Sequence, residues 1–177
     1  MEISNENGGL FLDRDGIINE EMGYVWKVED FRFRKGIFDL AKWAKSRQMP
    51  IIVITNQGGI AKGIYQLDKV QHLHAWMQAE FTAHGAPLTE ILFCPHHPEI
   101  NACLCRKPHT LLFERGLAKH RLKATHSIML GDQQRDLLPA MQLGIKAVYV
   151  GNQPNTVTDV MVEDLHMALQ WLKSNVQ

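Results

Sequence analysis

The sequence predicts an α/β fold in which a mostly parallel sheet of about five strands is covered by helices on both faces. Short apolar runs alternate along the chain with segments of helical periodicity, which is the pattern of such a doubly wound sheet. The 177 residues are 45% hydrophobic and 21% charged, which is typical of a globular protein with a substantial core. Because no repeat, low-complexity tract or linker-like shift in composition interrupts the chain, we expect one domain over residues 1–177.

Five short apolar segments are predicted as strands, and their alternation with helices indicates a Rossmann-like arrangement. The strands are expected at residues 9–13, 50–56, 89–93, 127–131 and 146–150. The helices are expected at residues 37–44, 67–81, 111–120, 136–143 and 161–173. Gly85 is expected to end the second helix. Pro139 is tolerated only near the start of a helix, so we expect its helix to begin close to Asp136.

The composition argues against some classes of partner. Lys plus Arg and Asp plus Glu each number 19, so no overall field favours nucleic acid or a membrane surface. An anionic substrate must therefore be bound by a local cluster of side chains. Residues 1–8 are polar and unlike a signal peptide, and the longest apolar run, residues 50–54, is far too short to cross a bilayer. We expect a cytoplasmic protein that acts as a monomer.

The stretch Asp13-Arg14-Asp15-Gly16 places two carboxylates close together where the first strand ends. The alternation of a strand points Asp13 and Asp15 to the same side, and Gly16 permits a sharp turn after them. Two acids held close together repel each other unless a cation or a shared proton lies between them. Taken alone, the pattern fits a solvated turn or a fragment of a calcium loop as well as it fits a functional site.

Polar and metal-binding side chains follow four of the predicted strands. These pairs are Asp13 and Asp15, Thr55 and Asn56, Cys94 and His96, and Gly131 and Asp132. Ligands of doubly wound sheets bind at the carboxyl ends of the strands, so these residues are expected to meet at one edge. Asp13 and Asp132 can share a hard dication with oxygen ligands, which favours Mg²⁺ over zinc at this edge.

Several of the remaining groups are suited to binding a phosphate. Thr55 offers a hydroxyl, and the turn Asn56-Gln57-Gly58-Gly59 offers backbone N–H groups. Arg106 and Lys107 can bring positive charge to the same place. A carboxylate that can attack, a second acid, a dication and phosphate donors together indicate phosphoryl transfer through an aspartyl-phosphate.

All three cysteines lie close together and, with one histidine, offer a complete tetrahedral zinc set: Cys94, His96, Cys103 and Cys105. Because the protein would fill all four positions, this zinc is expected to be structural and to hold the loop over residues 94–107. His97 competes with His96 for the fourth position, and the symmetrical C-x-H and C-x-C pairs favour His96.

Four motifs resemble those of haloacid-dehalogenase-type phosphatases: DRDG, TN, the lysine of RKP, and GDxxxD, in this order over residues 11–144. The resemblance implies that Asp13 is the nucleophile. It implies that Asp15 protonates the leaving alkoxide and then deprotonates the hydrolytic water. The other roles that it implies are phosphoryl binding by Thr55 and Lys107, Mg²⁺ binding by Asp13, Asp132 and the Asp15 backbone carbonyl, and support of the site by Asp136.

The cysteine loop is similar to the zinc loop of D-glycero-D-manno-heptose 1,7-bisphosphate phosphatases and of histidinol-phosphate phosphatases. Residues 19–31, 55–63 and 94–98 resemble the heptose family more closely, although Gly58 and Lys62 stand where that family usually has Ser and Arg. The resemblance implies a phosphorylated sugar substrate, hydrolysis of its 7-phosphate, and a place in nucleotide-heptose synthesis for cell-surface polysaccharides. Contacts to a second phosphate are expected from Arg106 and Lys62.

The spacing between the motifs leaves no room for a large cap domain, so the site is expected to be open. Histidinol-phosphate phosphatase remains the alternative, because the short gap between His96 and Cys103 suits both families. Two alternatives come from other classes. A receiver-like phospho-acceptor domain also uses clustered acids, but it has no acid placed like Asp15 and needs no zinc loop. A zinc-dependent interaction module would not require Asp13.

Overall fold

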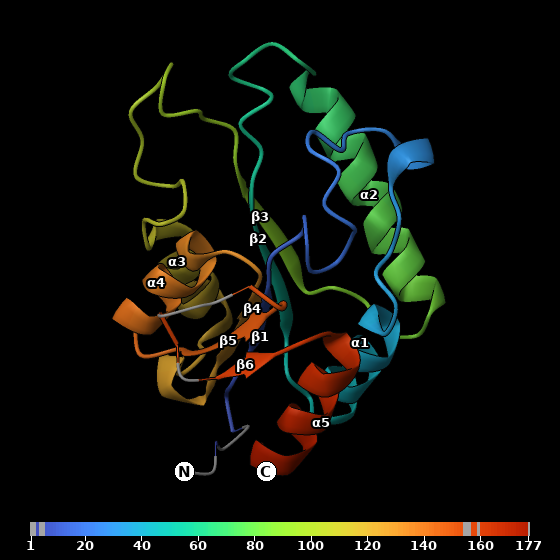
Figure 1. Ribbon diagram of the computed structural model, residues 1–177, viewed down its shortest axis with the longest axis vertical. Coiled ribbons are helices and arrows are strands. Elements are labelled where there is room, and N and C mark those ends of the chain that lie inside the picture. Colours follow the sequence, from blue (N-terminus) through green and yellow to red (C-terminus); the bar gives the residue numbers. More distant parts are fainter. Residues whose placement is uncertain (1–2, 4–5, 154–156, 159, 177) are drawn as a thin grey trace.

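The computed structural model describes residues 3, 6–153, 157–158 and 160–176, and over these residues the chain forms one parallel sheet between two layers of helices (Figure 1). The strand order is β3-β2-β1-β4-β5-β6. The strands are β1 Leu10–Leu12, β2 Ile51–Asn56, β3 Glu90–Cys94, β4 Ile128–Gly131, β5 Lys146–Val150 and β6 Met161–Val162. The predicted doubly wound architecture is therefore confirmed, with six strands in place of about five.

The strands alternate their apolar side chains between two buried clusters. Leu10 and Leu12 face the cluster that contains α1 (Ile37–Ser46), α2 (Leu67–Ala83) and α5 (Leu165–Asn175). Phe11 faces the other cluster, beneath α3 (Leu111–His120) and α4 (Gln134–Gln142). Because both faces are covered, the strands are apolar on both sides, which explains their nearly continuous apolar runs.

The last predicted helix, over residues 161–173, is wrong at its start. Met161 and Val162 form β6 and pair in parallel with Tyr149 and Val150 of β5. The helix α5 begins only after Asp164, whose Oδ1 accepts a hydrogen bond of 2.8 Å from the backbone N–H of Met167. A strand of two residues is too short to leave an alternating pattern, and its pairing with β5 is a tertiary event.

The helix α4 begins at Gln134, slightly before the expected start at Asp136. The reason is a reciprocal cap, in which the backbone N–H of Gln133 donates to Asp136 Oδ2 at 3.1 Å. Pro139 lies inside the helix. The cap matters for function because it fixes the Asp136 side chain at the carboxyl end of β4.

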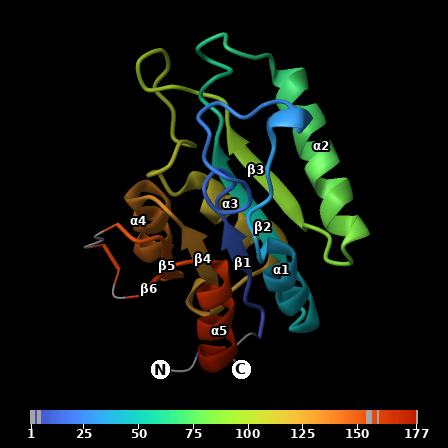
Figure 2. The same ribbon diagram turned by 45° about the vertical axis from the view of Figure 1, so that its right-hand side comes forward.

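The carboxyl ends of β1, β2, β3 and β4 lie at one edge of the sheet, and the loops that follow them extend above it (Figure 2). In register, Leu12 lies beside Val53 on one side and Leu130 on the other, so the residues that follow β1 emerge at the centre of this edge. Within the described residues, the segment between β1 and α1 holds only the short helix η1 (Val28–Asp30), and no cap domain covers the edge. Among all the residues that the structure describes, no helix combines the length and apolar character needed to span a bilayer.

Candidate active site

A buried lysine joins three elements at the centre of the sheet edge. Lys107 Nζ lies 2.7 Å from Asp13 Oδ1 and 2.7 Å from Asp136 Oδ1, and it donates to the backbone carbonyl of Ile54 at 2.7 Å. Asn56 holds the backbone of this lysine: its Nδ2 donates to the Lys107 carbonyl at 3.2 Å, and its Oδ1 accepts from the Lys107 N–H at 3.0 Å. The side chain of Asn56, predicted to bind phosphate, therefore positions Lys107.

Three carboxylates surround this single lysine. One oxygen each from Asp13, Asp132 and Asp136 lies within 4.8 Å of the others. Burial, assisted by the Asp136 carboxylate and opposed by Lys107, raises the pKa of Asp13 to about 8. Burial and the Asp136 carboxylate likewise raise the pKa of Asp132 to about 6. The cluster thus has more negative charge than Lys107 can balance, which is the condition that a bound cation relieves.

The oxygen atoms of this cluster fit a hard dication such as Mg²⁺. Asp132 Oδ1 is buried and has no hydrogen-bond partner among the described residues. A buried carboxylate oxygen without a partner costs free energy, and a hard cation with oxygen ligands would satisfy it. Gly16 makes room for Asp132, because a Cβ at position 16 would lie 2.2 Å from Asp132 Oδ2 and the backbone there has φ +90°. The glycine of DRDG therefore has a second role besides the turn.

Asp15 is held by donors on both of its carboxylate oxygens. Oδ1 accepts from Arg14 Nε at 3.1 Å, from Arg14 Nη2 at 2.6 Å and from Asn19 Nδ2 at 3.1 Å. Oδ2 accepts from Gln57 Nε2 at 3.1 Å. The Arg14 side chain is buried, donates to the Val25 carbonyl at 2.8 Å and lies 3.4 Å from His74 Nε2. Since the guanidinium can only donate, His74 accepts through Nε2 and is neutral.

These side chains open into a cavity of about 240 Å³ at the carboxyl edge. Its lining includes Asp13, Asp15, Thr55, Asn56, Gly58 and Lys107, together with His97, Arg106 and Arg135. Arg106 Nη1 donates to the His96 carbonyl at 2.9 Å. A Cβ at Gly58 would lie 3.0 Å from that same nitrogen, so the glycine leaves space for the guanidinium. The cavity thus contains the acids and the cations expected of a phosphate site.

Lys62 is not among the residues that line this cavity. Its Nζ lies 3.4 Å from Glu99 Oε2, and the same carboxylate oxygen lies 3.5 Å from His97 Nδ1. The sequence placed Lys62 near the substrate because of its motif, whereas the fold pairs it with the loop that follows β3. Arg135 at the start of α4 lines the cavity instead.

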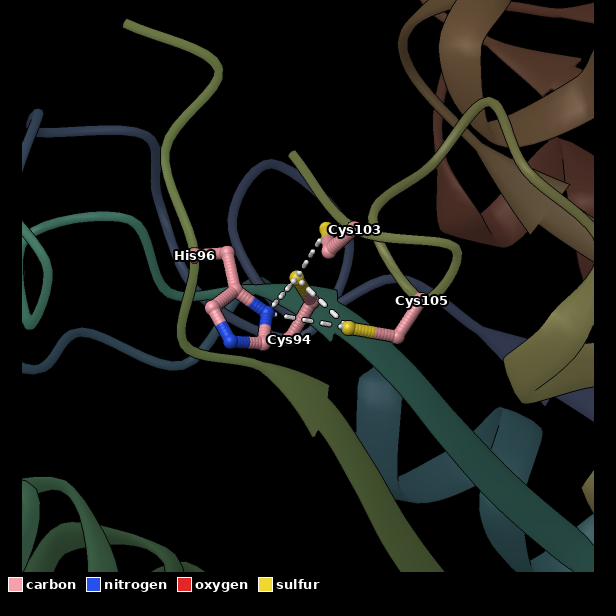
Figure 3. Close-up of side chains that lie close together, drawn as sticks. All are labelled: Cys94, His96, Cys103 and Cys105. Carbon is pink, nitrogen blue, oxygen red and sulfur yellow. Dashed lines mark hydrogen bonds between the residues drawn. The ribbon is translucent and has the colours of Figure 1, made fainter. Parts of the chain in front are cut away.

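The four side chains of the predicted zinc set point toward one another (Figure 3). Cys94 Sγ lies 3.7 Å from His96 Nδ1, 3.7 Å from Cys103 Sγ and 3.1 Å from Cys105 Sγ, and His96 Nδ1 lies 3.3 Å from Cys105 Sγ. Ligands of a tetrahedral zinc ion lie roughly 3.3–3.8 Å apart, given its usual bond lengths. The three spacings of 3.3–3.7 Å lie within this range, whereas the 3.1 Å between Cys94 Sγ and Cys105 Sγ is shorter, so the four ligand atoms are grouped as for zinc but one thiolate pair is closer than a bound ion would hold it. His97 lies outside the set and lines the active-site cavity.

Four residues with prominent contacts in this region escaped sequence reasoning: Arg14, Gln57, Tyr65 and His74. For His74, the place on the apolar face of the segment 67–81, among Val70, Met77 and Phe81, was the available signal, because a histidine on a core face needs a polar partner. The other three left no such signal, because the contacts of Arg14 with Val25 and His74, and of Gln57 with Asp15, join separate segments of the chain.

Known proteins resemble this chain over most of its length. A family model described as HAD-hydrolase-like matches residues 104–169. A D-glycero-beta-D-manno-heptose-1,7-bisphosphate 7-phosphatase from Helicobacter pylori is 44% identical over 143 residues, which cover 80% of this chain and 82% of the relative. A D-glycero-alpha-D-manno-heptose-1,7-bisphosphate 7-phosphatase from Burkholderia mallei is 38% identical over 146 residues, which cover 79% of this chain and 77% of the relative.

A solved structure has the same fold. It is a D,D-heptose 1,7-bisphosphate phosphatase from B. bronchiseptica complexed with magnesium and phosphate, and it matches with a TM-score of 0.83 and 24% identity over 94% of this chain and 98% of that one. The level of sequence identity to these relatives places the chain in their family. The chain is a phosphoric monoester hydrolase and belongs to the D-glycero-D-manno-heptose-1,7-bisphosphate 7-phosphatase family of haloacid-dehalogenase-like hydrolases.

Proposed function

We propose that this protein is a Mg²⁺-dependent phosphatase that removes the 7-phosphate of D-glycero-D-manno-heptose 1,7-bisphosphate through an aspartyl-phosphate on Asp13. The observation that carries the proposal is the contact of Lys107 with Asp13 at the floor of a cavity that Asp15 and Thr55 also line. This arrangement combines a nucleophile, a phosphate-binding cation, an acid and a hydroxyl donor.

In the first step, a carboxylate oxygen of Asp13 forms a bond to phosphorus while the bond from phosphorus to the sugar oxygen breaks. Lys107 and the Thr55 hydroxyl hold the transferring phosphoryl group, and Asp15 gives its proton to the departing sugar oxygen. In the second step, water attacks the aspartyl-phosphate, Asp15 takes a proton from that water, and Asp13 is regenerated as inorganic phosphate leaves.

We assign the metal to Asp13, Asp132 and the backbone carbonyl of Asp15, with Asp136 as a supporting residue that orients Lys107. When bound there, Mg²⁺ supplies positive charge to the phosphoryl oxygens during transfer. The unpartnered Oδ1 of Asp132 supports this assignment. A structural zinc on Cys94, His96, Cys103 and Cys105 is proposed separately, on the spacing of their ligand atoms.

Recognition of the second phosphate is assigned to arginine. Arg106 lines the cavity and is anchored to the zinc loop through the His96 carbonyl. A guanidinium can bind a phosphate through two parallel hydrogen bonds, which suits an open site that has few enclosing surfaces. The proposal includes a monomeric protein in the cytoplasm, a location that suits a charged sugar substrate.

The test is a comparison of kcat/KM for the α and β anomers of the heptose 1,7-bisphosphate and for histidinol phosphate. We expect at least about tenfold higher kcat/KM for one heptose anomer than for histidinol phosphate, because only the bisphosphate can pair with Arg106. The variant Arg106→Leu should lose more kcat/KM with the bisphosphate than with histidinol phosphate. Equal or higher kcat/KM with histidinol phosphate in the wild type would replace the proposed substrate.

A further inference from the structure

The side-chain amide of Gln57 links Asp15 to Thr55, and the residue is almost fully buried, at 1% exposure. Its Nε2 donates to Asp15 Oδ2 at 3.1 Å and to Thr55 Oγ1 at 2.9 Å. Its Oε1 accepts from the Tyr65 hydroxyl at 3.0 Å. Both amide hydrogens and the carbonyl therefore have partners, and the amide connects the loop that follows β1 to the end of β2.

Tyr65 fixes the orientation of this amide. Burial raises the pKa of Tyr65 to about 12, so its hydroxyl remains a donor. The Tyr65 ring fits over Gly59, where a Cβ would lie 2.3 Å from Tyr65 Cε1. The ring centroids of Tyr24 and Trp26 each lie 6.2 Å from that of Tyr65. Reversing the amide would place its carbonyl against the Asp15 carboxylate, which is repulsive. The donor end of Gln57 is therefore held toward Asp15 and Thr55.

The contact to Thr55 determines where the hydroxyl proton of Thr55 can point. Thr55 Oγ1 accepts the Gln57 hydrogen, so its own hydrogen remains available to a different acceptor. Thr55 is buried and lines the cavity. A phosphoryl oxygen bound there is the acceptor that this orientation favours.

The contact to Asp15 distinguishes its two oxygens. Oδ1 already accepts three hydrogen bonds, from two nitrogens of Arg14 and one of Asn19, whereas Oδ2 accepts only the one from Gln57. An oxygen that accepts three donors has no lone pair left for a proton. Oδ2 retains one, and the Gln57 hydrogen bond limits the directions in which an Oδ2–H group can point.

We propose that Gln57 is a positioning residue, oriented by Tyr65, that aims Asp15 Oδ2 at the leaving oxygen of the substrate. In this step the bond from phosphorus to the leaving oxygen breaks, its electron pair stays on that oxygen, and the proton of Asp15 Oδ2 transfers to it. The same Oδ2 later takes a proton from the attacking water. This inference rests on the proposed reaction of Asp13 and Asp15, and it adds a residue that acts through Asp15 and not on the substrate directly.

The experiment compares kcat/KM for phenyl phosphate and 4-nitrophenyl phosphate in the Mg²⁺-loaded wild type and in the Gln57→Leu and Tyr65→Phe variants. Phenolate is a more basic leaving group than 4-nitrophenolate and depends more on a proton from Asp15. We expect Gln57→Leu to lose at least about tenfold more kcat/KM with phenyl phosphate than with 4-nitrophenyl phosphate. Tyr65→Phe should shift the ratio in the same direction by a smaller factor.

The matched control is Gln78→Leu, which also removes a side-chain amide, one that donates at 2.8 Å to the carbonyl of Leu88, in the segment between α2 and β3. It should leave the ratio of the two substrates unchanged. Equal losses with both substrates in Gln57→Leu would limit Gln57 to a structural role or to Thr55, and would overturn the proposal. If Gln57→Leu does not fold, an unchanged ratio in Tyr65→Phe overturns it. An unimpaired Asp13→Asn variant would instead refute the proposed reaction.

Discussion

Lys107 Nζ lies 2.7 Å from Asp13 Oδ1, although the two residues are 94 positions apart in the chain. The lysine also contacts Asp136, so it holds the carboxyl ends of β1 and β4 together. Its position depends on Asn56, which binds the backbone of Lys107 through both a donor and an acceptor. Four segments of the chain therefore meet at one buried ammonium group, and the stability and chemistry of the site both depend on it.

The variant Lys107→Met is expected to lower the free energy of unfolding by about 3–5 kcal/mol in metal-free buffer, because it leaves two buried carboxylates without their cation. Urea unfolding measures this change. The control is Lys119→Met, which removes an ion pair of 2.6 Å between Glu90 and a lysine that is 65% exposed. That variant should lose less than about 1 kcal/mol. Similar losses in the two variants would contradict the importance of burial at Lys107.

The variant Asp13→Asn is expected to lose at least about a thousandfold in kcat while the fold is retained, because an amide cannot attack phosphorus. Release of inorganic phosphate measures the activity, and thermal unfolding measures the fold. The amide also removes one charge from the cluster of three acids, so the unfolding temperature without metal should not fall. Substantial activity in this variant would exclude Asp13 as the nucleophile.

Removal of zinc is expected to loosen the loop over residues 94–107 and to lower activity through Arg106 and Lys107. The wild type should contain one zinc per chain by elemental analysis, and Cys105→Ser should contain much less. Relative to the wild type, hydrogen exchange in this variant should become faster in the loop and not in the helices. The control His109→Asn changes an exposed histidine of the same region and should keep its zinc. A wild-type protein purified without zinc would contradict the assignment.

Acidic pH is expected to destabilise the protein through His74. Burial, with the adjacent Arg14, lowers the pKa of His74 to about 3, from 6.5 for an ordinary histidine. Above pH 6.5 the imidazole is neutral in both states, so the free energy of unfolding is unaffected. As the pH falls below that value, only the unfolded state takes up the proton, and the free energy of unfolding decreases by about 1.4 kcal/mol per unit until the folded pKa is reached.

The variant His74→Gln tests this pH dependence, because glutamine can still accept from Arg14 but does not titrate. Its free energy of unfolding should fall less steeply than that of the wild type between pH 6 and 4, measured by urea unfolding. His72→Gln on the same helix changes an exposed histidine and should follow the wild-type curve. Identical curves for wild type and His74→Gln would show that His74 is not buried in its neutral form.

The sequence alone was sufficient for the architecture and for the expectation that most of the candidate site residues lie together. Periodicity located the five main strands because a strand buried on both faces must be apolar along its whole length. The acids at 13, 15 and 132 could be grouped because the carboxyl ends of parallel strands share one edge. The zinc set could be grouped because three of its members are cysteines within one short loop, so no long-range contact had to be inferred.

Only the tertiary structure decided the contacts between side chains that are distant in sequence. It placed His96, and not His97, in the zinc set, and it paired Lys62 with Glu99 away from the cavity. It also added β6 as an outer strand beside β5 and joined Gln57 to Asp15. These outcomes depend on which polar group lies nearest once the core has packed, and a local pattern of residues carries no information about that distance. Patterning therefore specified where the functional groups gather, whereas packing specified which atoms they bind.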